Sequence, residues 1–307
     1  MILFNTSDNL EDFCSKYGIR ILINDNKKST LYIPATQYFC NNPSINQPIT
    51  IGNSIECYAL FYNCQQFNQS IMIPNNATNC SYMFSNCYNF NQPITIPNNI
   101  TNCYRMFNNC FNFNQPVNIY SNQADLTEMF LRCIKFNQPV TIPNGIQICK
   151  GLFHTCQNFN QSIIIPNSVF RCETMFYDCI KFNQPIIIPN TVQVCTNMFA
   201  RCSNFNQTVI IPNNVYDCQN MFENCNNFDN SIYFKRINSS GLRVGGLIVG
   251  CNSSKKKNIF FNSALNSIFN NTSSYSTIVG KSVTWTAMTN GFYNAAFNVY
   301  CYYNYVP

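Results

Sequence analysis

Cysteine is the residue type that could do most chemistry in this sequence, which holds 19 cysteines and a single histidine. Thiolates bind metal ions, form disulfides or act as nucleophiles, and histidine serves as a base or a metal ligand. The cysteines recur in two series with a 23-residue interval. One series is Cys64, Cys87, Cys110, Cys133, Cys156, Cys179, Cys202 and Cys225, and the other is Cys57, Cys80, Cys103, Cys149, Cys172, Cys195 and Cys218.

The spacing of these cysteines argues against metal binding and catalysis. Structural zinc sites need ligands that converge tetrahedrally, usually from Cys-x₂₋₄-Cys pairs, whereas copies in register place these thiols in parallel columns. No cysteine stands apart from the columns beside an activating neighbour, and His154 has neither a second histidine nor a carboxylate near it in sequence. We therefore predict no metal, no cofactor and no catalytic residue, and we expect the protein not to be an enzyme.

Disulfides between neighbouring copies are a separate question, because such cysteines would lie within bridging range. In one copy Leu126 replaces the first cysteine while Cys133 is kept. If the two cysteines formed a disulfide, we would not expect one of them to be kept where the other is lost. A small buried apolar position, by contrast, accepts Cys or Leu alike. We interpret the columns as reduced core residues, with disulfides as the alternative.

The elements that must position these residues follow from the full repeat, C-x-x-[ML]-F-x-x-C-x-x-F-N-Q-[PST]-[IV]-x-[IV]-P-N-x-[IV]-x-x. A strict period of this length indicates a solenoid, in which stacked coils share one core. The Ile-x-Ile-Pro segment alternates and predicts a short strand ended by proline, and the Cys-x-x-Met-Phe-x-x-Cys spacing predicts a helical or 3₁₀ turn. The predicted fold class is an α/β-type repeat solenoid: a leucine-rich-repeat-like parallel β stack with short helical or 3₁₀ turns.

Two copies, MFSNCYNFNQPITIPNNITNC and MFYDCIKFNQPIIIPNTVQVC, carry a family resemblance. The Ile-x-Ile-Pro half resembles the BspA-like leucine-rich repeats of bacterial and protist surface proteins. The Met-Phe-x-x-Cys-x-x-Phe-Asn-Gln-Pro half resembles the related Mycoplasma-type lipoprotein repeats. The resemblance covers about residues 45–234. It implies adhesion or binding, without shared catalytic residues, and it implies export for many members.

The flanking sequences predict three parts. Residues 1–44 are expected to form an N-terminal cap, with a helix from Ser7 through Tyr17 and a hairpin of Ile19–Asn24 and Thr30–Ile33. Residues 45–234 form about eight to nine coils of 23 residues. Residues 235–307 leave the period and predict a β-rich C-terminal cap or docking domain.

Asparagine and glutamine follow the second phenylalanine of each copy, as in Asn91 and Gln92. At the bend into the strand, their side-chain amides can hydrogen-bond backbone groups and stack on one another. This structural interpretation stands beside a functional one, a polar stripe that binds glycans.

The candidate binding face is the residue between the two core positions of each strand, because alternation points it outward. This column comprises Thr95, Asn118, Thr141, Ile164, Ile187, Ile210 and Tyr233, preceded by Thr50 and Met72. The first rungs are mainly polar and the last four are apolar. Exposed apolar rungs would mark an interface; alternatively, the chain's own C-terminal segment covers them.

Composition limits the partners. Charged residues make up 10% of the chain, the net charge is +6, and Lys255-Lys256-Lys257 is the densest basic run, so we expect no nucleic-acid binding. The sequence contains no run of about 18 apolar residues, so we expect no membrane insertion. The N-terminus lacks the pattern of a secretory signal.

These features favour a virion-associated protein, a phage head or tail component assembled in the host cytoplasm. Its expected partners are other virion proteins or a host-surface protein or glycan, and self-association is open. The alternative is a BspA-like interaction or adhesion protein of a bacterium or protist, in the cytoplasm or at the cell surface.

Overall fold

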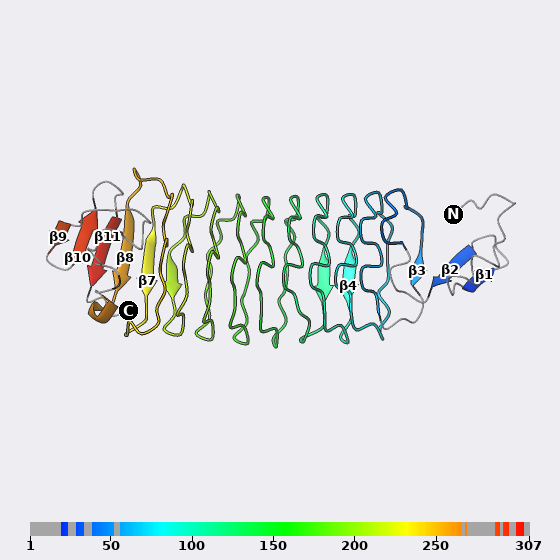
Figure 1. Ribbon diagram of the computed structural model, residues 1–307, viewed down its shortest axis with the longest axis horizontal. Coiled ribbons are helices and arrows are strands. Elements are labelled where there is room, and N and C mark those ends of the chain that lie inside the picture. The colour runs from blue at the N-terminus through cyan, green and yellow to red at the C-terminus, as the bar shows by residue number, and fades with distance from the viewer. Residues whose placement is uncertain are drawn as a thin grey trace. The chain divides into compact units, whose positions relative to one another are not determined.

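The computed structural model of the chain describes residues 20–23, 29–33, 39–51, 56–265, 268, 286–288, 291–294 and 299–303. The chain forms two compact units, Met1–Pro143 (unit 1) and Asn144–Pro307 (unit 2). Strands of both units are labelled in Figure 1. Unit 1 holds strands β1 (Arg20–Ile23), β2 (Ser29–Ile33), β3 (Thr50–Ile51), β4 (Ile94–Ile96) and β5 (Val117–Ile119). Unit 2 holds β6 (Val209–Ile211), β7 (Ser231–Phe234), β8 (Lys257–Phe261), the 3₁₀ helix η1 (Ser263–Leu265), β9 (Thr286–Met288), β10 (Gly291–Asn294) and β11 (Val299–Tyr303).

The N-terminal strands of unit 1 lie where the sequence predicts a hairpin. β1 and β2 pair antiparallel, with Arg20 opposite Tyr32, and β3 joins β2 in parallel. The helix predicted from Ser7 through Tyr17 lies outside the described residues.

The strand segment of each coil shows the expected alternation of burial. In β4, Ile94 and Ile96 are buried while Thr95 is exposed, and β5 pairs with β4 in parallel. In unit 2, β6 repeats the pattern with Ile210 exposed. Coils in which the segment forms no regular strand keep the same alternation. Each coil therefore presents one strand residue outward and two to the core.

The turn segment between the two cysteines of each coil is not a helix. Cys80, Tyr82, Phe84 and Asn86 each donate a backbone N–H to the next coil at 2.7–2.9 Å. Between them, the Met83 and Ser85 N–H groups donate to a carbonyl three residues earlier. Tyr82 and Asn86 are left-handed, with φ of 55° and 63°. The hydrogen bonds of a 3₁₀ turn are thus present. Left-handed residues four positions apart, however, reverse the chain before a helix can continue. The seven-residue cysteine spacing reflects two successive turns.

Two columns of fully buried phenylalanine rings form the core of each unit. In unit 1 the Phe84 and Phe107 ring centroids are 5.6 Å apart, and those of Phe90 and Phe113 are 5.9 Å apart, with planes within 11° of parallel. Unit 2 repeats the arrangement with Phe153, Phe176, Phe199 and Phe222 in one column and Phe159, Phe182, Phe205 and Phe228 in the other. Within each unit, the inner rings of a column are therefore enclosed by the coils before and after them.

The asparagine column braces neighbouring coils, as its structural interpretation predicts. The Asn91 N–H donates to Asn68 Oδ1 at 2.8 Å, the Asn114 N–H donates to Asn91 Oδ1 at 2.8 Å, and Gln92 Nε2 donates to the Asn68 carbonyl at 3.2 Å. In unit 2 the same bond joins Asn183 to Asn160, Asn206 to Asn183 and Asp229 to Asn206. The column's amide oxygens are therefore engaged within the fold.

Replacing Asn91 by alanine should lower the free energy of unfolding by about 1–3 kcal/mol, because the Asn114 N–H loses its acceptor. Asn91→Asp keeps an acceptor oxygen and should cost less than about 1 kcal/mol. Asn76→Ala, at an exposed position of the preceding coil, is the control and should change stability by less than about 0.5 kcal/mol. Urea unfolding measures all three; equal effects of Asn91→Ala and Asn76→Ala would contradict the bracing role.

Coil structure extends past both boundaries expected from the sequence. In unit 1, Phe39 stacks on Phe61 at 5.4 Å, so the first coil begins before residue 45. In unit 2, the Asn224 N–H bonds the Val249 carbonyl and Cys251 Sγ donates to the Phe222 carbonyl, so the turn half recurs after residue 234. These end copies are not separated from their neighbours by 23 residues, so a search for the 23-residue period does not find them.

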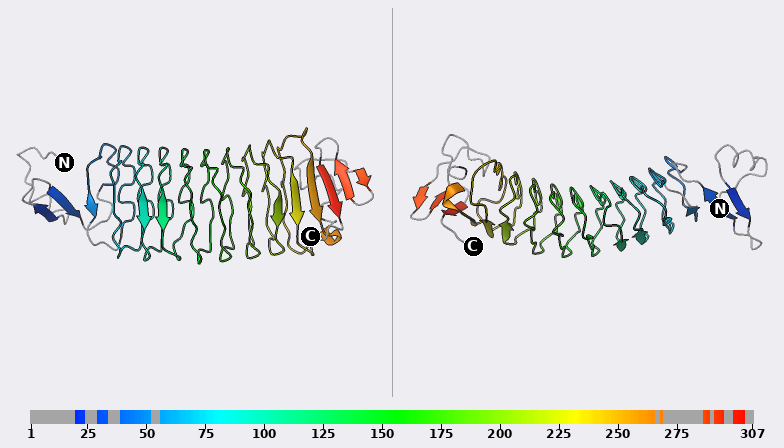
Figure 2. Two further views of the ribbon diagram at one scale, coloured as in Figure 1. Left: turned by 180° about the vertical axis from the view of Figure 1, so that it is seen from behind. Right: turned by 90° about the horizontal axis from the view of Figure 1, so that it is seen from below.

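The C-terminal strands of unit 2 continue the coil sheet, whose order is β6-β7-β8-β11-β10-β9 (Figure 2, yellow to red). β8 pairs in parallel with β7 and with β11, and β10 pairs antiparallel with β11 and β9. The predicted β-rich C-terminal part therefore adds strands beside the last coil.

Candidate binding face

The cysteine thiols lie in the core rather than at a surface site. Cys87 Sγ donates to the Phe61 carbonyl at 2.9 Å, and burial raises the pKa of Cys64 to about 12. Leu126, at the place where one copy lacks cysteine, is fully buried. The thiol-to-carbonyl contact recurs for Cys110, Cys133, Cys179, Cys202 and Cys225. These thiols pack as core groups. Burial raises the pKa of Cys64, Cys87, Cys110, Cys179, Cys202 and Cys225, which suppresses the reactive thiolate of each.

The other side chains that could do chemistry are the carboxylates and His154. Over the described residues, no three His, Cys, Asp or Glu side chains are arranged to hold a metal ion. His154 lies on the turn side of unit 2, its ring 4.6 Å from that of Tyr177, and the Arg201 guanidinium sits 5.6 Å from the Tyr177 ring centroid. The histidine therefore lies against an aromatic ring, and that ring in turn lies against the Arg201 cation.

In unit 1 the outward strand column is polar and uncharged. Thr95, Asn118 and Thr141 are exposed, and the register of β4 and β5 places Thr95 beside Asn118. Met72, in an earlier coil, is the apolar rung and is 85% exposed. This face offers hydroxyl and amide groups to a partner.

In unit 2 the outward column is apolar. Ile164 and Ile187 are 86% and 85% exposed, and Ile210 is 46% exposed. β6 and β7 place Ile210 beside Tyr233, which is half-buried. Isoleucines on three successive coils therefore form one stripe, the isoleucine stripe.

Two residues that sequence reasoning missed prolong this column. Tyr233 stacks on Phe260 at 4.6 Å, and Phe260 stacks on Tyr302 at 5.0 Å, in register across β7, β8 and β11. The sequence predicted a β-rich C-terminal part but could not show that its strands join the coil sheet.

Ile164 and Ile187 are exposed, so the described C-terminal strands β8, β9, β10 and β11 do not cover them. The C-terminal strands β8 and β11 lie in the plane of the sheet, where they flank Tyr233. Parallel pairing explains this placement. The unpaired backbone groups at the edge of the coil sheet can hydrogen-bond the next strand, which therefore lies beside β7 in the same sheet.

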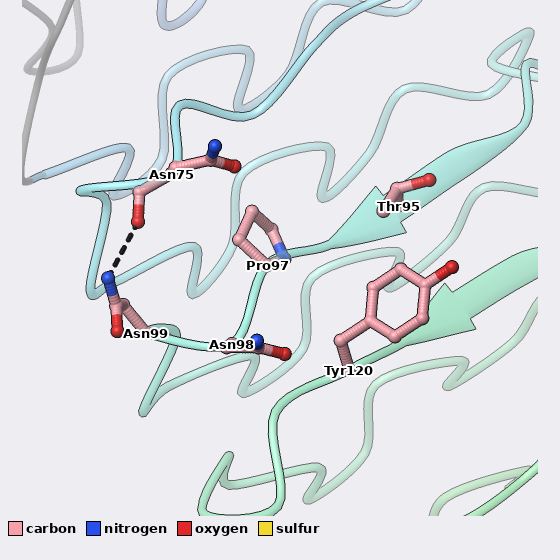
Figure 3. Close-up of a pocket in the computed structure, with 6 residues that line it drawn as sticks. All are labelled: Asn75, Thr95, Pro97, Asn98, Asn99 and Tyr120. Atoms are coloured by element: carbon pink, nitrogen blue, oxygen red, sulfur yellow. Dashed lines mark hydrogen bonds between the residues drawn. The ribbon is translucent and has the colours of Figure 1, made fainter.

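A shallow pocket of about 550 Å³ lies on unit 1 (Figure 3). Its lining residues are Asn75, Thr95, Pro97, Asn98, Asn99 and Tyr120. Tyr120 is 63% exposed and stands where the preceding coil has Pro97. That replacement of the repeat's proline by an aromatic residue is the sequence signal that could have identified the pocket.

The repeats also match a known family. The family described as "Mycoplasma protein of unknown function, DUF285" matches residues 35–142 and 124–235, which together span residues 35–235 of the 307. The chain belongs to the DUF285 family. This match confirms the resemblance to Mycoplasma-type repeats. None of the curated proteins compared with the chain matches it.

Solved structures show a related fold. A leucine-rich repeat protein from Bacteroides ovatus ATCC 8483 aligns with a TM-score of 0.56 at 18% identity, covering 79% of this chain and 69% of that one. The pneumococcal vaccine antigen PcpA aligns with a TM-score of 0.45 at 13% identity, covering 76% and 66%. A leucine-rich cell surface protein from Faecalibacterium prausnitzii A2-165 aligns with a TM-score of 0.36 at 18% identity, covering 94% and 93%. The first likeness confirms the leucine-rich-repeat solenoid and, at this identity, shows the fold alone.

Within the described part of the chain, no helix has both the length and the apolar character needed to cross a bilayer.

Proposed function

We propose that this DUF285 protein is a non-enzymatic binding protein that contacts another macromolecule through the outward strand column of unit 2. The observation that carries the proposal is the isoleucine stripe of unit 2, Ile164, Ile187 and Ile210. Single exposed apolar residues are ordinary, but aligned large apolar side chains mark interaction surfaces. The strands keep two of every three residues in the core, so the outward rung is the position open to a partner.

The surroundings of the stripe indicate an apolar, uncharged protein surface as the partner. The exposed residues two positions before its rungs are Ser162, Pro185 and Thr208, none of which is charged. In unit 2, Arg243 Nη1 pairs with Asp217 Oδ2 at 2.9 Å on the turn side, and Lys255 pairs with Asp229 at the bend before β7. A charged partner would find no counter-charge on these strands.

Replacing Ile164 and Ile187 by asparagine should weaken partner binding at least about tenfold while the fold is retained. Each fully buried isoleucine contributes roughly 1.5–3 kcal/mol at an interface. Met72→Asn is the matched control, because Met72 holds the same position in a coil of unit 1 and is equally exposed. Binding of the labelled protein to purified particles and to cell envelopes measures the effect, and circular dichroism checks the fold. Unchanged binding by the folded double variant would contradict the proposal.

For the biological setting we propose a virion, where the protein would meet other virion proteins or a host surface. The support is the division of the chain into regular coils with an open face and a non-repetitive C-terminal sheet that could dock on a particle. The second setting is the surface of a bacterium or protist, which the same binding chemistry would serve.

Mass spectrometry of purified particles and of fractionated cells separates the two settings. Constant stoichiometry in particles, through successive purification steps, is the expected result. Recovery in the cell envelope fraction without particles would replace the virion with the cell-surface setting.

A further inference from the structure

The pocket around Tyr120 in unit 1 is a binding site that the fold does not require. Tyr120 follows β5, and its backbone N–H donates to the Ile96 carbonyl at 3.0 Å, but its ring is 63% exposed. Pro97 fills the equivalent position of the preceding coil and is buried. An aromatic ring here adds exposed apolar surface without contributing to the core.

Polar groups converge around this ring. Thr95 is exposed on β4, and Asn98 and Asn99 lie on the turn that follows Pro97 (Figure 3). Asn99 Nδ2 donates to the Asn75 carbonyl at 2.8 Å, which fixes one wall of the pocket. Within the described part of the chain, the side-chain amides of Asn75 and Asn98 have no protein hydrogen-bond partner. The pocket therefore combines one open aromatic face, one hydroxyl and free amide donors and acceptors.

No charged side chain lines the pocket, and this decides the ligand class. A phosphate, carboxylate or ammonium group would lack a counter-charge there. A neutral sugar ring presents an apolar C–H face that can pack on an aromatic ring, together with hydroxyls that pair with amides and hydroxyls. We propose that the pocket binds a neutral saccharide, with Tyr120 as the stacking platform.

The outward column next to the pocket suits a longer glycan. Asn118 lies beside Thr95 across β4 and β5, and both side chains are exposed and uncharged. Neighbouring strands are about 5 Å apart, close to the length of one sugar unit, so successive rungs can meet successive sugars. The site differs from the glycan stripe considered for the Asn91 column, whose amide oxygens bond the next coil.

Titration with neutral hexasaccharides of glucose (β-1,4 and α-1,4), mannose and N-acetylglucosamine tests the proposal by calorimetry and saturation-transfer NMR. At least one should bind, and Tyr120→Ala should weaken it by about tenfold or more, while Tyr120→Phe keeps the affinity within about threefold. Asn98→Ala should weaken it about three- to tenfold, through loss of a hydrogen bond. Tyr216→Ala, at an exposed tyrosine of unit 2, is the matched control and should leave binding unchanged.

Binding of no hexasaccharide at about 5 mM, or equal affinity of wild type and Tyr120→Ala, would overturn the proposal. If Tyr120→Ala fails to fold, Tyr120→Pro replaces it, since proline occupies this position in the preceding coil. The site uses residues of unit 1 only, so it can fail while the isoleucine stripe of unit 2 still binds its partner, and the reverse also holds.

Discussion

Raising the pH from 8 to about 10.5 should unfold the protein, because its core is rich in buried thiols. Burial raises the pKa of Cys64 and of Cys149 to about 12. Burial also raises the pKa of Cys87, Cys103, Cys110, Cys172, Cys179, Cys195, Cys202, Cys218, Cys225 and Cys301. Cys57 is an exception, since a hydrogen bond with Cys80 lowers its pKa.

The sign follows from proton linkage. A thiol in the unfolded chain ionises near pH 8.5, whereas the buried thiol stays protonated, so the folded state binds more protons above that pH. Each such thiol contributes stability that is complete below about pH 8.5 and decreases by about 1.4 kcal/mol per pH unit until the pH reaches its folded pKa. Ten such thiols would together lower the free energy of unfolding by more than about 10 kcal/mol per pH unit. Over two pH units this loss exceeds the usual stability of about 5–15 kcal/mol.

Urea unfolding followed by circular dichroism at several pH values between 7 and 10.5 measures this loss, with a phosphine reductant present to exclude oxidation. Cys179→Ala should lower the slope of stability against pH above 9 by about 1.4 kcal/mol per unit, apart from any constant cavity cost. A stability that is flat from pH 8 to 10.5 would show that the thiols are not protonated core groups.

Phe107→Ala should lower the free energy of unfolding by about 3–5 kcal/mol. The Phe107 ring is fully buried and stacks on Phe84 and Phe130, both at 5.6 Å, and on Phe113 at 4.5 Å. Removing it leaves a cavity between coils that hydrogen bonds hold in register, so the gap cannot close easily. The loss should concentrate in the neighbouring coils, since each coil contacts mainly those beside it.

Phe111→Ala is the control within the same coil. Phe111 is half-buried and stacks on Tyr88 at 4.9 Å at the surface, so its loss should cost about 1 kcal/mol. Urea unfolding and hydrogen exchange of the amides around each site give the two values. Similar costs at both positions would contradict the assignment of the phenylalanine columns as the main source of stability.

Much of the coil could be predicted from the sequence because each position recurs in the same environment. The register of Phe90, Ile94 and Ile96 in every copy identified the core, and Thr95 was identified as outward because a strand alternates. The repeated Asn91 position indicated a backbone brace, since an amide is needed wherever the bend leaves the same N–H unpaired.

The turn conformation could not be predicted in this way. A spacing of three, four and seven residues suits a helix as well as two successive turns, and the left-handed backbone at Tyr82 and Asn86 separates them. Asparagine at such a position is compatible with a left-handed backbone, but tyrosine does not indicate one. Tyr82 adopts it because its backbone hydrogen bond to the next coil stabilises this conformation.

The period, the core positions and the outward column follow from the amino-acid pattern alone, because they depend on spacing within one coil. The tertiary structure decided which outward residues are open. Ile187 stays exposed because β8 and β11 extend the sheet beside Tyr233 instead of folding over the stripe, and pairing between strands distant in sequence is not encoded in a local pattern. It likewise decided that Tyr120 faces a pocket, since Thr95 and Asn75 come from preceding coils and meet it only when the coils stack.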